Sequence, residues 1–106
     1  MEQLPVLACC TPLTSKLAEP EAGELAQLFS ALGDKTRVRI VNLLVEAGEA
    51  CCVCDLEPEL GVGQPTVSYH LKRLIEVGLL EREKRGTFSY YRLAPEALGR
   101  VRALFA

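Results

Sequence analysis

Apolar residues recur at steps of three and four along the first half of the chain, and this spacing predicts two amphipathic helices. The first spans residues 22–32, and its apolar face consists of Leu25, Leu28, Phe29 and Leu32. The second follows Asp34, whose carboxylate is suited to accept hydrogen bonds from the free amides of a first helical turn. Its apolar stripe consists of Val38, Val41, Leu44 and Val45.

Two further helices joined by a glycine turn are predicted in the middle of the chain. Pro58 lacks a backbone N–H and is tolerated in the first turn of a helix, so the third helix is expected to begin near Asp55, with Asp55 as its cap. It ends at Gly61, and Gln64 and Pro65 begin a fourth helix. The apolar face of this fourth helix consists of Val67, Leu71, Leu74 and Ile75. A helix, a short turn and a second helix form the helix-turn-helix plan.

A hairpin and a last helix complete the predicted fold. Residues 79–83 and 87–93 have strand composition and flank a basic glycine turn at residues 84–86, which predicts a two-stranded wing. Pro95 suits the first position of a helix. The apolar side of that helix consists of Leu98, Val101, Leu104 and Phe105. The expected fold is therefore mainly α with a small β-hairpin.

Composition is that of one globular domain. The chain has 106 residues, of which 49% are hydrophobic and 25% charged, with a net charge of −2. We expect an arm over residues 1–21 that carries the vicinal pair Cys9-Cys10, and one folded domain over residues 22–106. No apolar run reaches the roughly 18 residues of a membrane span, and the N-terminus lacks a signal-peptide pattern, so a soluble, cytoplasmic protein without a membrane partner is expected.

Positive charge is concentrated in residues 64–92, which hold six Lys or Arg against three Glu. Basic side chains on a helix and a hairpin suit DNA phosphates, and polar side chains at the start of the second helix of a helix-turn-helix face base edges. The alternative is a solvated basic face, and for His70 the alternative is packing or internal hydrogen bonding. The candidate residues for binding double-stranded DNA are Gln64, Thr66, Ser68, Tyr69, His70, Lys72, Arg73, Lys84, Arg85 and Thr87.

The five cysteines form two clusters, Cys9-Cys10 and Cys51-Cys52-Val53-Cys54, and His70 is distant from both in sequence. Clustered thiols in an odd number indicate metal binding or redox chemistry rather than structural disulfides. Three or four thiolates without histidine select As(III), Sb(III), Cd(II) or Pb(II) over Ni(II) or Co(II). The alternative is that Cys51 and Cys52 are small buried apolar residues and that the arm is a disordered tail.

Several segments, in combination and order, resemble the ArsR/SmtB family of metal-responsive winged helix-turn-helix repressors, most closely its arsenic-sensing type. The resemblance covers about residues 25–104. It is carried by residues 28–37, the Cys52-Val53-Cys54-Asp55-Leu56 box, residues 64–74, Gly78-Leu79-Leu80 and residues 84–93.

The resemblance implies a homodimer that binds operator DNA and leaves it when As(III) or Sb(III) binds, with no cofactor required and no catalytic residues. Cys52 and Cys54 then inherit the ligand role. Glu57 stands where many arsenic sensors carry a third cysteine, so Cys9 and Cys10, or Cys51 as a substitute, are expected to complete the site. The first and last helices would join the subunits, through Leu25, Leu28, Phe29, Leu98, Val101, Leu104 and Phe105.

Three alternatives remain open. Residues 94–106 contain no histidine, which argues against the zinc site of other family members. A Cd(II) or Pb(II) sensor would use the same thiolates, and a redox or persulfide switch would use them without a metal. A small arsenate reductase or thiol oxidoreductase would need an activating His or Lys beside the thiols, which the sequence does not provide.

Overall fold

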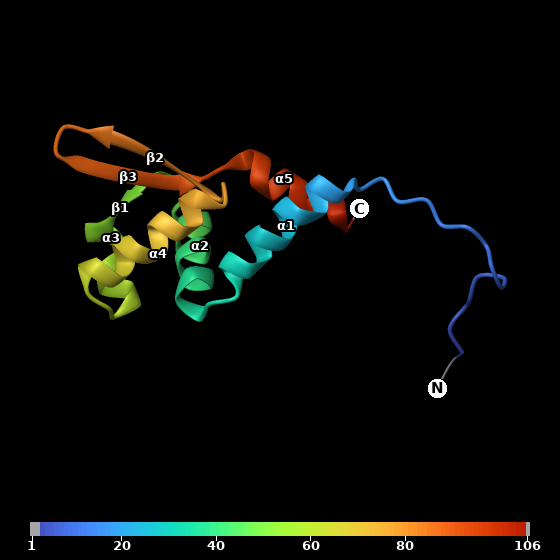
Figure 1. Cartoon of the computed structure of the whole chain (residues 1–106). Coiled ribbons are helices and arrows are strands. Elements are labelled where there is room, and N and C mark those ends of the chain that lie inside the picture. Colours follow the sequence, from blue (N-terminus) through green and yellow to red (C-terminus); the bar gives the residue numbers. More distant parts are fainter. Residues whose placement is uncertain (1–2, 106) are drawn as a thin grey trace.

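The computed structural model describes residues 3–105, which form five helices and a three-stranded antiparallel sheet (Figure 1). Residues 3–18 precede the first helix as an arm that runs away from the body of the molecule. In chain order the elements are α1 (Glu19–Leu32), α2 (Lys35–Ala47), β1 (Cys51–Cys52), α3 (Val53–Leu60), α4 (Gln64–Glu76), β2 (Leu80–Arg85), β3 (Phe88–Leu93) and α5 (Pro95–Leu104).

The predicted helix-turn-helix is confirmed as α3 and α4. Gly61 ends α3 in the left-handed region at a φ of 69°, a conformation that side chains with a Cβ rarely adopt. Gly63 is the N-cap of α4, and Pro65 occupies its first turn, where a missing N–H costs nothing. The turn between the helices is therefore short because glycine permits it.

The sheet has one strand more than the sequence predicts. β2 and β3 form the expected hairpin, and β1 pairs antiparallel with β3 on its other side, with Cys51 opposite Tyr91 and Cys52 opposite Tyr90. The hairpin turn is also shifted: Arg85 pairs with Phe88, so the turn lies at Gly86-Thr87 and the basic residues belong to β2. A strand of two residues has no periodicity of its own, which is why the sequence did not reveal it.

The predicted start of the third helix is wrong by two residues. α3 begins at Val53 with Cys52 as its N-cap, and Asp55 is the third helical residue rather than the cap. An Asp55 carboxylate oxygen accepts a hydrogen bond from the Cys52 backbone N–H at 3.0 Å, the reciprocal contact of a capping box. Pro58 therefore lies inside the helix, where the Cys54 carbonyl loses its usual donor.

α1 begins three residues before the predicted position, at Glu19, because Pro20 fits within its first turn. Glu19 and Glu21 also place negative charge at the helix N-terminus, where the dipole favours it. The extended arm consequently ends at Ala18.

The hydrophobic core surrounds α4. Its fully buried side chains come from α1, α2, α3, α4 and the segment before β2, and the largest of them are Leu28, Ile40, Leu56, Leu71, Leu74, Leu79 and Val67. One face of α4 is thus fixed by burial, and the opposite face is left at the surface.

Leu28→Ala should lower the free energy of unfolding by about 2–5 kcal/mol, because the change leaves a cavity beneath α1 at a position that is 1% exposed. Chemical denaturation at one protein concentration measures this. Leu13→Ala in the arm, where the side chain is 81% exposed, is the control and should have little effect. Equal stability of both variants would contradict the placement of Leu28 in the core.

Candidate functional site

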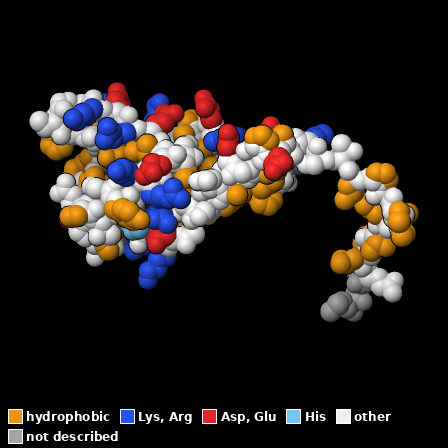
Figure 2. Space-filling model, viewed as in Figure 1, with side chains coloured by type: hydrophobic (Ala, Val, Ile, Leu, Met, Phe, Trp, Pro, Cys, Tyr) orange, Lys and Arg blue, Asp and Glu red, His pale blue; other side chains and the backbone are white. Residues whose placement is uncertain are grey.

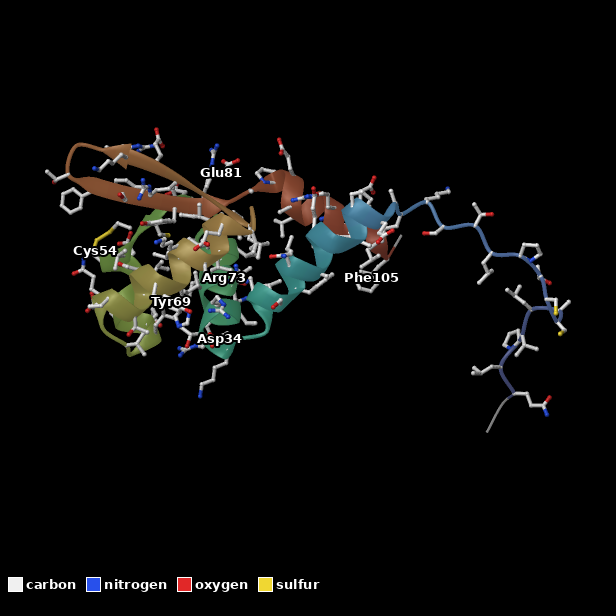
Figure 3. All side chains as sticks on the ribbon, in the orientation of Figure 1. Asp34, Cys54, Tyr69, Arg73, Glu81 and Phe105 are labelled. Atoms are coloured by element: carbon white, nitrogen blue, oxygen red, sulfur yellow. A yellow bond between two sulfur atoms is a disulfide. The ribbon has the colours of Figure 1, made fainter. Side chains whose placement is uncertain are left out.

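The surface face of α4 carries the polar residues that the sequence nominated for base contacts. Gln64, Thr66, Ser68 and Lys72 are exposed, and Tyr69 is 62% exposed (Figure 3). Arg73 is half-buried. The N-terminal end of α4 therefore presents hydrogen-bonding side chains outward, as a helix that reads a DNA groove requires.

The hairpin formed by β2 and β3, here called the wing, carries the nominated cations near its turn. Lys84, Arg85 and Thr87 are all exposed. The Arg85 guanidinium lies 2.9 Å from a Glu83 carboxylate oxygen and 5.4 Å from the centre of the Tyr90 ring, and hydrogen bonding to Glu83 raises the pKa of Arg85. Figure 2 shows Lys and Arg side chains gathered over the wing and the helices beneath it.

His70 is a correction to the predicted set, since it lies on the buried side of α4. Only 9% of the residue is exposed, and its Nδ1 lies 3.1 Å from Nη1 of Arg37 on α2. A guanidinium can only donate, so Nδ1 is the acceptor and the ring proton is on Nε2, which lies 4.0 Å from an Asp34 carboxylate oxygen. His70 therefore ties α4 to the start of α2 and is not at the DNA-reading face.

Arg37 is a functional residue that sequence reasoning missed. Its side chain donates from Nε to the carbonyl of Ala31 in α1, as well as pairing with His70. Asp34 caps α2 by accepting from the amides of Thr36 and Arg37, and the Arg37 amide is the main cause of the lowered pKa of Asp34, with the charges of His70 and Arg37 contributing. One polar network thus joins α1, α2 and α4.

Cys52 and Cys54 lie together at the start of α3, and the structure joins them in a disulfide (Figure 3). The sequence predicted free thiolates here, and the disulfide is a difference from that expectation. Cys52 is 6% exposed, Cys54 is exposed, and the ligand atoms of Cys52, Cys54 and Asp55 all lie within 4.8 Å of one another. When the pair is reduced, two sulfurs this close suit a single soft ion.

The two sulfurs share a groove with the DNA-reading residues. This groove has a volume of about 450 Å³, and its walls come from the start of α3, the start of α4 and the turn of the wing. Its lining includes Cys52, Cys54, Gln64, Ser68, Thr87 and Phe88. Anything bound to the sulfurs is therefore adjacent to both parts of the molecule that would touch DNA.

The other three cysteines differ in position and chemistry. Cys51 is half-buried in β1 with its sulfur 3.5 Å from the carbonyl oxygen of Glu49, and burial, followed by the charges of Asp55 and Glu49, raises the pKa of its thiol. Cys9 and Cys10 are exposed in the arm with their sulfurs 3.3 Å apart. The arm leaves α1 on the side away from α3, so one chain does not bring all the candidate ligands together (Figure 1).

The predicted dimer residues divide into a buried group and an exposed group. Leu25 and Leu28 are buried within their own chain, and Leu28 is a core residue, which corrects its assignment to a subunit interface. Val101 is half-buried and packs against the core. The apolar residues that remain at the surface of α1 and at the end of the chain are Phe29, Leu98, Leu104 and Phe105.

Comparison with known proteins assigns this architecture to a family. The family model for bacterial regulatory proteins of the arsR family matches residues 34–82. ArsR2 of Halobacterium salinarum is 40% identical over 84 residues, which are 79% of this chain and 70% of that protein. The chain belongs to the arsR family of bacterial regulatory proteins.

Other members of the family extend the comparison. The arsenical resistance operon repressor of Escherichia coli is 52% identical over 69 residues, which are 65% of this chain and 58% of that protein. The crystal structure of the AntR antimony-specific transcriptional repressor matches with a TM-score of 0.71 at 28% identity, covering 96% of this chain and 91% of that one.

The solution structure of the homodimeric winged helix-turn-helix domain of Mb0332 from Mycobacterium bovis matches with a TM-score of 0.69 at 29% identity, covering 90% and 86% of the two chains. The protein is thus a winged helix-turn-helix transcriptional regulator and not an enzyme. Within residues 3–105, no helix has the length and apolar character needed to cross a membrane.

Arg85→Ala should make the dependence of DNA affinity on salt less steep, by about 0.9 in the logarithmic slope if one phosphate contact is lost. The effect should be similar for selected and random duplexes, measured by fluorescence anisotropy across a salt series. Arg92→Ala is a matched control, because Arg92 is paired with Glu81 at 2.8 Å on the same wing. An unchanged slope for Arg85→Ala would remove this residue from the phosphate contacts.

His70→Ala should lower the free energy of unfolding by about 1–3 kcal/mol, because it removes the acceptor for Arg37 at a buried position, and should leave base preference unchanged. Ser68→Ala, at an exposed position of the same helix, should show the opposite pattern. Denaturation together with selection from a randomised duplex pool measures both properties. Altered base preference without loss of stability would instead make His70 a base contact.

Proposed function

We propose that this protein is a repressor that binds operator DNA as a homodimer and leaves it when Cys52 and Cys54, as thiolates, bind As(III) or Sb(III). The observation that supports this most directly is the groove that the two sulfurs share with Gln64, Ser68 and the turn of the wing. The relatives named as arsenical resistance and antimony-specific repressors favour these ions.

The proposed third thiolate comes from the arm of the second subunit. As(III) and Sb(III) favour sulfur, and the position one turn after Cys54 is occupied by Glu57, whose carboxylate is a hard ligand. Cys9 and Cys10 are exposed on an arm that extends away from its own α3, and a long exposed arm suits reaching a neighbouring subunit. The apolar surface of Phe29, Leu98, Leu104 and Phe105 would supply the contact between the two chains.

Ion binding would act on DNA affinity through the start of α3. Cys52 is the N-cap of this helix and also pairs with Tyr90 of β3, so a change in the position of its sulfur affects both the helix and the wing. α3 packs directly against α4 through core residues such as Leu56 and Leu71. A displacement of α3 therefore moves the DNA-reading helix relative to its copy in the second subunit.

Thiolates also accept Cd(II) and Pb(II), so these ions compete with the metalloids as inducers. A release assay that compares As(III), Sb(III), Cd(II), Pb(II) and Zn(II) on reduced protein decides between them. The operator duplex for this assay is the sequence that reduced protein selects from a random pool. Coupling between two sites of this kind typically weakens DNA binding by roughly 5 to 150-fold.

Cys54→Ser should leave operator affinity unchanged and abolish release by As(III), because it removes an exposed sulfur without altering the core. Cys51→Ser is the matched control next to the site and should still be released. Anisotropy titrations of labelled operator, with and without As(III), measure both variants. If Cys54→Ser is released at the wild-type As(III) concentration, Cys54 is not a ligand.

A further inference from the structure

The disulfide between Cys52 and Cys54 occupies the same two sulfurs that the proposed function assigns to the metalloid. The Cα atoms of the two residues are 5.3 Å apart, within the range of about 4.4–6.8 Å that disulfides require. Adjacent cysteines have Cα atoms only about 3.8 Å apart, which disfavours bonds within Cys9-Cys10 or Cys51-Cys52. The spacing by two residues therefore singles out this pair for oxidation.

The DNA-reading parts of the chain are formed while the disulfide is present. α3 runs from Val53 to Leu60 with the capping contact between Asp55 and Cys52 in place. α4 keeps its buried stripe, and Gln64 and Ser68 remain exposed. Oxidation is thus compatible with the winged helix-turn-helix conformation, including the pairing of β1 with β3.

We propose that the Cys52–Cys54 pair is a redox gate: its oxidation to the disulfide keeps the repressor on the operator and makes it unresponsive to As(III) and Sb(III). This inference rests on the proposed function, because it concerns the same sulfurs. A sulfur held in a disulfide carries no thiolate charge and has no capacity to replace the oxygen ligands of an arsenite molecule. The inducer would therefore act only on reduced protein.

The oxidant class that the gate requires is a hydroperoxide. The Cys54 thiolate attacks one peroxide oxygen, the O–O bond breaks, and the product is a sulfenic acid at Cys54 together with hydroxide or alkoxide, which takes up a proton. The Cys52 thiolate then attacks the Cys54 sulfur and displaces hydroxide, which is released as water after protonation. With hydrogen peroxide, two thiols and one oxidant give one disulfide and two water molecules. A dithiol reductant reverses the reaction by two thiol–disulfide exchanges.

The exposure of the two residues fits this order of events. Cys54 is exposed and meets the oxidant first, whereas Cys52 is 6% exposed and adjacent, as a resolving thiol should be. Cys51 is half-buried with its sulfur near the carbonyl of Glu49, so it is not needed for the reaction.

The test uses full-length Cys51→Ser protein, in which Cys52 and Cys54 are the only cysteines of the tryptic peptide spanning residues 40–72. Hydrogen peroxide is added until this peptide no longer reacts with iodoacetamide while the arm peptide, residues 1–16, still does. Excess reagents are removed, and binding to the selected operator is measured by anisotropy before and after addition of As(III). A reduced sample and a sample oxidised and then reduced again are run in parallel, each after removal of the reductant.

The expected result is equal operator affinity for reduced and oxidised protein, with As(III) releasing the reduced and re-reduced samples only. Release of the oxidised protein at the same As(III) concentration would overturn the gate, and so would loss of operator binding on oxidation alone, which would make peroxide itself an inducer. A reduced sample that As(III) does not release would overturn the proposed function, and the gate with it. The first two failures leave the proposed function intact, so the outcomes are distinguishable.

Discussion

The pairing of β1 with β3 determines where the sulfurs lie. Cys51 and Cys52 stand opposite Tyr91 and Tyr90, so the segment that carries the thiols is an edge of the wing as well as the N-terminus of α3. Because the strand ends where the helix begins, Cys52 cannot move without affecting both elements. This arrangement puts the candidate ion site at the junction of the two parts of the protein that face DNA.

A second constraint holds α4 in place from the other side. Arg37 bridges the carbonyl of Ala31 and the ring of His70, so the start of α2, the end of α1 and the middle of α4 share one polar network. The buried stripe of α4 completes this anchoring. The helix therefore moves as part of a packed unit, and a change at the start of α3 is passed to it through the core rather than absorbed by a loop.

The chain separates its thiols into two groups with different surroundings. Cys52 and Cys54 belong to the folded body, whereas Cys9 and Cys10 are exposed on an arm that one chain directs away from α3. In Figure 3 Phe105 lies at the end of the body opposite Cys54, so the apolar surface and the sulfur groove are well separated on the monomer. A complete thiolate site of the proposed kind is consequently a property of the dimer, and the redox state of the inner pair is a property of the single chain.

The sequence by itself determined the helices, the glycine turn of the helix-turn-helix, the hairpin and the exposed polar face of α4. These features depend on local periodicity, on glycine at Gly61 and Gly63 and on proline at Pro65, all of which act within a few residues. The sequence also grouped Cys52 and Cys54 as one chemical unit. Only the tertiary structure decided that β1 exists, that His70 faces Arg37 and that Leu28 belongs to the core, because each depends on partners distant in the chain. The start of α3 was misjudged because the capping contact between Asp55 and Cys52, and a proline tolerated inside a packed helix, outweigh the local rule that favours proline in a first turn.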